Sequence, residues 1–195
     1  MKEDGNNAID KEPLMADIQI PKSLHEVFGE KQSALEIACV FAFAFVGTAI
    51  VYWHLYLPMN AELNWKVALG FVLIADVLAG CVANFTKGTN QYYAARPSSR
   101  FTFIAIHFHI IAIAWLLGGS LLSAWIIWGN TIAAAMVINS LKGHKFQLFI
   151  AANLLCYGLL LLLILPLEPW LLACSLFFMT KVMFSFAVDH YANAE

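Results

Sequence analysis

Charged residues are scarce in this chain of 195 residues: 12% are Asp, Glu, Lys or Arg, whereas 61% are hydrophobic. A soluble domain is usually about half apolar and about a quarter charged, so this composition excludes an ordinary soluble fold. The formal net charge of -2 provides no positive field, which excludes nucleic acid as a partner. The composition therefore predicts an all-α, polytopic integral membrane helical bundle surrounded by the lipid bilayer.

Paired cysteines and a cleavable leader are also lacking. The four cysteines lie singly in apolar segments, so we interpret them as small buried residues rather than disulfide partners or zinc ligands: Cys39, Cys81, Cys156 and Cys174. Residues 1–32 are polar and have no apolar core typical of a signal peptide. We therefore expect the first membrane span to act as the insertion signal.

Known catalytic and cofactor motifs are absent: there is no HExxH, nucleophile elbow, P-loop or GxGxxG pattern. We predict no metal site, because His107 and His109 are two residues apart and point to different sides of a straight helix. A haem held by His107 and His190 stays open, as does a retinal Schiff base on Lys181 with Asp76 as counterion. The cofactor is therefore unknown at this point.

Six apolar segments are long enough to cross a bilayer core of roughly 30 Å: residues 34–57, 65–84, 101–117, 120–141, 146–165 and 170–188. The uncharged stretch 101–141 must contain two of them, because a single helix of that length would measure about 60 Å. We place the turn at Gly118-Gly119-Ser120, and a break at Gly129-Asn130 is the alternative.

These spans divide the chain into a polar N-terminal tail (1–32), a six-span membrane domain (33–190) and a short C-terminal tail (191–195). Residues 20–31 mix apolar and charged side chains at helical spacing, so we expect either an interfacial helix or a short solvated helix there. Residues 87–100 hold most of the turn-forming residues and are expected to form the longest internal loop.

Lysine and arginine are distributed unequally between the two ends of the predicted bundle. If the N-terminus is cytoplasmic, the outer connections hold Lys66 alone, and the inner segments hold Lys2, Lys11, Lys22, Lys31, Lys87, Arg96, Arg100, Lys142 and Lys145. This positive-inside bias predicts an N-in/C-in orientation, and with the lack of a leader it favours a bacterial inner (cytoplasmic) membrane. The same basic loops could bind anionic lipid.

Ionisable residues within membrane spans are costly, so they are functional candidates. Asp76 in the second span and Lys181 in the sixth each lie eight residues, about 12 Å, from the inner end of their span. His107 lies about 10 Å above Arg100 in the third span. We therefore expect an acid, a base and an imidazole at one level in the cytoplasmic half, and we favour His107 over His109 for this position.

Two polar stripes with a four-residue spacing support this site: Asp76, Gly80 and Asn84 on span two, and Lys181, Ser185 and Asp189 on span six. We expect the stripes to face each other above an inner rim that includes Asn84, Arg96, Arg100, Asp189 and His190. An ion pair between Asp76 and Lys181 that only holds two helices together is the alternative interpretation.

Three functional hypotheses follow from this pattern. The first is a small transporter or channel for a small or anionic solute, with Asp76, His107 and Lys181 as a cytoplasm-facing, proton-coupled site. The second is a membrane-embedded enzyme for a lipid or quinone-like substrate, with His107 as acid or base and Arg96 and Arg100 holding an anionic headgroup. The third is a non-catalytic subunit of a larger membrane complex. Homo-oligomerisation is left open.

Overall fold

The computed structural model describes residues 16–59 and 63–192, and it confirms an all-α bundle with six helices long and apolar enough to span a membrane. These helices are Ala34–Tyr56, Trp65–Ala83, Pro97–Leu117, Leu121–Ser140, Gln147–Ile164 and Pro169–Phe186. Each boundary lies within about four residues of its predicted position. The side of the membrane on which the termini lie stays a prediction.

Three of the spans are single α-helices: α3 (Trp65–Ala83), α7 (Leu121–Ser140) and α8 (Gln147–Ile164). The other three change their helical form along their length. The first passes from α2 (Ala34–Ile50) into the π-helix η3 (Val51–Tyr56), and the sixth passes from α9 (Pro169–Met179) into the π-helix η4 (Thr180–Phe186). The third is interrupted between α5 (Pro97–Ala105) and α6 (His109–Leu117).

Local sequence signals explain where several spans begin and end. Ser33 caps α2 in a capping box with Glu36, and the Asn64 side chain accepts hydrogen bonds at the start of α3. Gly118 ends α6 with a φ of 76°, a left-handed conformation that glycine adopts without steric cost. The predicted turn at Gly118-Gly119-Ser120 is therefore confirmed, and the break at Gly129-Asn130 is wrong because both residues lie inside α7.

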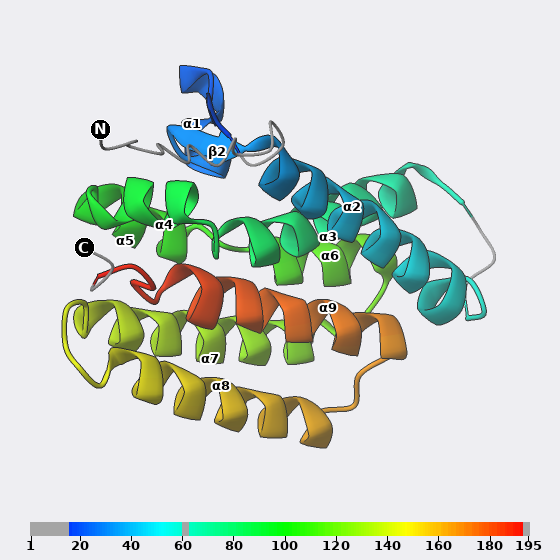
Figure 1. The fold of residues 1–195 in the computed structure, drawn as a ribbon. Coiled ribbons are helices and arrows are strands. Elements are labelled where there is room, and N and C mark those ends of the chain that lie inside the picture. Colours follow the sequence, from blue (N-terminus) through cyan, green and yellow to red (C-terminus); the bar gives the residue numbers. More distant parts are fainter. Residues whose placement is uncertain (1–15, 60–62, 193–195) are drawn as a thin grey trace, which may run out of the picture.

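The last span is the central helix of the bundle. It lies between α3 on one side and α7 and α8 on the other (Figure 1), and its η4 segment contacts all three. In keeping with this position, 61% of the most apolar stretch of this span is buried inside the protein, whereas the corresponding share for the first span is 17%. Side chains on η4 can therefore reach residues of several other spans.

Only part of residues 20–31 is helical, and whether this region lies along a membrane surface stays a prediction. Strand β1 (Asp17–Gln19) pairs antiparallel with β2 (Lys31–Ser33), and only the short η2 (Lys22–Leu24) and α1 (His25–Phe28) lie between them. The periodic pattern is interrupted by Pro21 and Gly29, and Gly29 has a φ of 71° that stops α1. Residues 1–15 of the expected N-terminal tail lie outside the described residues.

The expected loop at residues 87–100 is also wrong, because helix α4 (Lys87–Ala94) occupies its first half and α5 begins at Pro97. The Thr86 hydroxyl caps α4 by accepting from the Thr89 amide. The N-terminal hairpin packs on this helix, since Tyr93 Oη donates to the Glu26 carbonyl at 3.1 Å and Thr89 Oγ1 donates to the Val27 carbonyl at 3.1 Å.

Candidate functional site

The predicted acid and base of spans two and six meet within the bundle. Lys181 Nζ lies 2.8 Å from Asp76 Oδ2 and also donates to the Asp76 carbonyl at 3.3 Å. On the other side of the carboxylate, His109 Nε2 lies 3.2 Å from the same Oδ2. These three residues, together with the adjacent His107, are called the ion cluster below. An acid, a base and an imidazole therefore lie at one level, although the imidazole in contact is that of His109, and the cytoplasmic side of this level stays a prediction.

Lys181 reaches Asp76 across a gap that a glycine leaves in α3. Its side chain is only 4% exposed, and a Cβ atom placed on Gly80 would lie 2.8 Å from its Nζ and closer still to its Cε. One turn further along, Ser185 Oγ donates to the Cys81 carbonyl at 2.8 Å. The two polar stripes therefore face each other at this level, as predicted, and Gly80 provides the space.

The preference for His107 over His109 assumed a regular helix, and the third span is not regular. Residues 106–108 separate α5 from α6, and the interruption turns both imidazoles toward the same region, with ring centroids 5.1 Å apart. His109 contacts Asp76, whereas His107 Nδ1 lies 2.5 Å from the Phe103 carbonyl. His109 therefore contacts Asp76 directly, whereas His107 lies next to His109 and contacts the Phe103 carbonyl.

Several polar atoms of the ion cluster have no partner in the described part of the chain. His107 Nε2 and His109 Nδ1 are buried without one. Because a carbonyl and a carboxylate only accept hydrogen bonds, the other nitrogen of each ring is the donor, and these two are acceptors in neutral imidazole. Both contacts of Asp76 go to Oδ2, which leaves Oδ1 as a third unused acceptor.

Asp76 lies at the surface of the bundle rather than in its interior, and the side of the membrane that the site faces stays a prediction. Its side chain is 53% exposed. It lies on the stripe of α3 that carries the exposed Leu69 and Val72, seven and four residues before it. Asp76 is about 16 Å along the axis from the start of α3 and about 10 Å from its end. The carboxylate thus opens on the flank of the bundle, well inside the span.

Three aromatic rings pack together between the ion cluster and the end of the bundle that holds Arg100. Phe103 and Phe186 stack with centroids 4.0 Å apart, and Tyr93 meets the edge of Phe186 at 4.8 Å. Phe103 is also 4.0 Å from the ring of His107. Tyr93 and Phe186 are both buried. This aromatic layer separates the ion cluster from Arg100.

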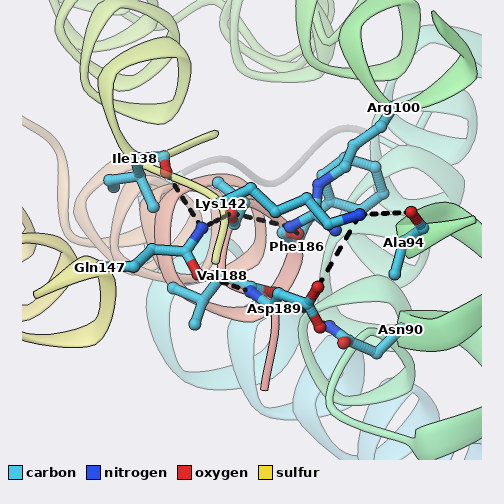
Figure 2. Close-up of polar contacts among 10 residues, drawn as sticks. Asn90, Ala94, Arg100, Ile138, Lys142, Gln147, Phe186, Val188 and Asp189 are labelled. Atoms are coloured by element: carbon cyan, nitrogen blue, oxygen red, sulfur yellow. Dashed lines mark hydrogen bonds and ion pairs between the residues drawn. The ribbon is translucent and has the colours of Figure 1, made fainter. Parts of the chain in front are cut away.

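Arg100 is not part of an open rim but is buried, with 1% exposure, against the end of the last span. Its Nη2 donates to the carbonyls of Phe186 and Ala187 at 3.0 and 2.8 Å. Figure 2 shows that Asn90 and Gln147 approach the same turn, where they donate to Val188 and Ala187 at 3.0 and 3.3 Å. We call Arg100, Asn90 and Gln147 the carbonyl clamp. It satisfies carbonyls that a helix terminus leaves without partners.

Two other residues predicted for the inner rim, Asp189 and His190, also have hydrogen-bond or ion-pair partners within the protein. Asp189 Oδ2 lies 3.8 Å from Lys142 Nζ, and the Asp189 amide donates to Gln147 Oε1 at 3.2 Å (Figure 2). His190 Nε2 lies 2.9 Å from the Phe184 carbonyl, and burial lowers the pKa of this imidazole below its usual value. Asn84 is buried, and its Nδ2 has no partner within residues 16–59 and 63–192.

Arg96 is the one predicted rim arginine that stays partly exposed. Its Nη2 forms a 2.8 Å ion pair with Glu30 of the N-terminal hairpin, and its guanidinium lies over the ring of Tyr92. An exposed pair of this kind contributes little to stability. Both rim arginines therefore have intramolecular partners, which argues against the predicted headgroup site made of Arg96 and Arg100.

Among residues 16–59 and 63–192, no group of three or more His, Cys, Asp or Glu side chains is placed to hold a metal ion.

The four cysteines are all free thiols, with Cys81 and Cys174 buried and Cys39 and Cys156 exposed. The expectation that all four are buried is thus wrong for two of them, which lie on bundle surfaces where an apolar residue faces lipid.

Comparison with known proteins adds no relative: no family model, no curated protein and no solved structure matches the chain.

Proposed function

We propose that the chain is a small proton-coupled membrane transporter whose working site is the ion cluster. The observation that supports this most is the position of the cluster at two irregular helices. Lys181 lies in the π-helical segment of the last span, and His107 and His109 lie at the interruption of the third. Helix interruptions within a membrane are tolerated where they line a binding site, and π-helical segments are frequent at functional sites.

The charges in the cluster provide a means of coupling. Asp76 holds the ammonium of the buried Lys181, so a proton taken up by the carboxylate would leave Lys181 without its counter-charge in a medium of low dielectric. Imidazole exchanges protons near neutral pH, and His109 contacts the carboxylate directly. A proton and a bound solute therefore compete for Asp76, which is the thermodynamic basis of coupled transport.

Solute-induced currents test this function. Purified protein in liposomes on a solid-supported membrane is exposed to a panel of small amines, alcohols, phenols and carboxylic acids, with and without a pH gradient. We expect a current with at least one class, abolished in Asp76→Asn, which removes the charge but keeps a hydrogen-bond acceptor for Lys181. Glu30→Gln is the matched control, because that carboxylate lies outside the spans. Wild-type currents in Asp76→Asn would contradict the proposal.

A membrane-embedded enzyme is the second candidate, favoured by the half-exposed flank position of Asp76. A lipid or quinone-like substrate dissolved in the bilayer could meet the carboxylate there, with His109 and His107 as acid and base. Product formation by purified protein in lipid, lost in both His109→Gln and His107→Gln, would favour this candidate over transport. No turnover on a broad panel of lipids and quinones would count against it.

Orientation, location and assembly belong to the same proposal. The Lys and Arg residues of the described loops gather at the end of the bundle where the N-terminal hairpin and α4 lie (Figure 1), and Lys66 lies at the start of α3. This asymmetry supports cytoplasmic termini in a bacterial inner membrane and contact of the basic loops with anionic lipid. Protease protection of tags at the two ends tests the orientation. Native mass spectrometry separates a homo-oligomer from a subunit of a larger complex.

A further inference from the structure

The flank of α3 provides a direct route from the bilayer to the ion cluster. Asp76 is 53% exposed, and the stripe on which it lies continues through Val72, which is 63% exposed, and Leu69. The apolar side chains of this stripe suit lipid tails, whereas the carboxylate does not, since a charge within the hydrocarbon region is costly. A ligand with a polar group at the depth of Asp76 would remove this conflict.

The routes from the two ends of the bundle are closed by packed side chains. Toward the basic end, the aromatic layer of Tyr93, Phe103 and Phe186 covers His107. Toward the other end, the spans next to Asp76 pack through fully buried residues, among them Ile74, Ile110 and Ile113. Water-filled access through either end would require this packing to open, whereas the flank is already open.

The unused hydrogen-bonding capacity of the cluster indicates what the ligand must offer. Asp76 Oδ1, His107 Nε2 and His109 Nδ1 are acceptors without a partner in the described residues. Lys181 uses two of its three donors on Asp76. Acceptors thus exceed donors, and a ligand that completes the site supplies N–H or O–H groups.

From these observations we infer that the ion cluster is loaded sideways from the bilayer, and that its ligand is a membrane-dissolved alcohol or phenol that donates a hydrogen bond to Asp76. The hydroxyl reaches Asp76 Oδ1 while the apolar body lies along Val72 and Leu69. This inference rests on the proposed working site but not on transport, because an enzyme would use the same entrance.

Two carbodiimides of opposite solubility test the entrance on the wild-type protein in liposomes. Dicyclohexylcarbodiimide dissolves in the bilayer, whereas a permanently cationic carbodiimide stays in water. Each adds to a protonated carboxyl to form an O-acylisourea, which rearranges to a stable N-acylurea with all atoms kept. Alternatively, the Lys181 amine displaces the urea and forms an amide with Asp76. The reaction is run at about pH 4, near the ordinary pKa of a carboxyl group, and both products are read by mass spectrometry of peptides.

Glu30 is the internal control, because its side chain is 57% exposed and that of Asp76 is 53% exposed. Equal exposure removes burial as the cause of a difference in labelling. The ratio of labelling by the two reagents at each residue also removes the effect of that residue's own ion pair, so it reports the surrounding medium. We expect the apolar reagent to modify Asp76, and the cationic reagent to modify Glu30 at least tenfold faster than Asp76. Modification of both residues at similar rates by the cationic reagent would overturn lateral access. Labelling of Glu30 by dicyclohexylcarbodiimide with no modification of Asp76, both in the wild type and in Lys181→Met, where Asp76 has lost its ammonium partner, would show the flank to be covered, which also overturns it.

A competition experiment tests the class of ligand. Nonylphenol and its methyl ether have the same apolar body, but only the phenol has a hydroxyl donor. We expect the phenol to slow modification of Asp76 by dicyclohexylcarbodiimide several-fold and the ether to have little effect. Equal protection by the ether, or no protection by the phenol, would overturn the assignment. Failure of the proposed transport function is seen separately, as wild-type currents in Asp76→Asn, and leaves the labelling pattern unchanged.

Discussion

Replacing Gly80 with alanine should disconnect Lys181 from Asp76 without altering either charged residue. A Cβ atom at position 80 would lie 2.8 Å from Lys181 Nζ and 3.1 Å from its Cδ. These separations are too short for unbonded atoms, and the backbone of α3 is fixed by its contacts with α2 and α6. The flexible lysine side chain is therefore the part that moves, and its 2.8 Å contact with Asp76 Oδ2 is lost.

Two effects of opposite sign determine the change in stability. Alanine in the interior of a helix is favoured over glycine by roughly 0.5–1 kcal/mol. Loss of a hydrogen bond between charged groups costs about 1.5–3 kcal/mol, because a buried ammonium is left without its partner. The free energy of unfolding of Gly80→Ala should therefore fall by about 1–2 kcal/mol.

Gly129→Ala is the matched control, because Gly129 lies inside α7 and no heavy atom outside its own helix lies within 4 Å of a Cβ placed there. Its free energy of unfolding should rise by roughly 0.5–1 kcal/mol. Denaturation of both variants in mixed micelles, followed by circular dichroism, gives the two values. Changes of the same sign would refute the argument. The argument would also be refuted if Gly80→Ala lowered the free energy of unfolding equally in a Lys181→Ala background, because the clash with the lysine side chain is absent there.

Three further predictions concern the basic end of the bundle. Arg100→Met removes both hydrogen bonds of the guanidinium to the last span and should lower the free energy of unfolding in micelles by about 2–4 kcal/mol, whereas Arg100→Lys should lose less. His190 has a pKa lowered by burial below its usual 6.5, so its contribution to stability is full above about pH 6.5 and is lost as the pH falls toward the folded pKa. A pH series of unfolding midpoints should show this loss in the wild type and not in His190→Gln. Gly88→Ala would place a Cβ against the carbonyl oxygen of Lys31, so hydrogen exchange should accelerate in residues 17–33 and not in the spans.

The span boundaries could be predicted from the sequence because they depend on local properties. Uncharged segments of about 20 residues identify membrane helices, and Gly118 marked the turn between α6 and α7 because its left-handed backbone favours glycine. The contact between Asp76 and Lys181 was also predictable, since two ionisable residues at equal depth have few other partners in a bilayer.

The interruption of span three could not be predicted, because residues 105–109 contain neither proline nor glycine. The α-helix nevertheless ends at Ala105 and a new one begins at His109, and it is His109 that contacts Asp76. The outward position of Asp76 was missed for a related reason. A four-residue spacing shows which side chains share a stripe but not which stripe faces lipid.

The carbonyl clamp was missed because its acceptors are backbone atoms. Asn90 and Gln147 bond the carbonyls of Val188 and Ala187, which lie 98 and 40 positions away in the chain. Backbone carbonyls occur at every position and give no signal in a sequence. Arg100 was assigned to an open rim for the same reason, since its partners are also carbonyls.

The two polar regions of the bundle differ in whether a ligand can reach their unused hydrogen-bonding atoms. Among the residues that the structure describes, Arg100 Nε and Nη1 have no partner, yet Arg100 is 1% exposed and enclosed beside Phe186. The ion cluster also has unpartnered atoms, but its carboxylate is half exposed. Substitution of Arg100 should therefore act first on unfolding midpoints. Substitution of His109 should act first on currents or turnover, since its contact with the half-exposed Asp76 contributes less to stability than a fully buried one.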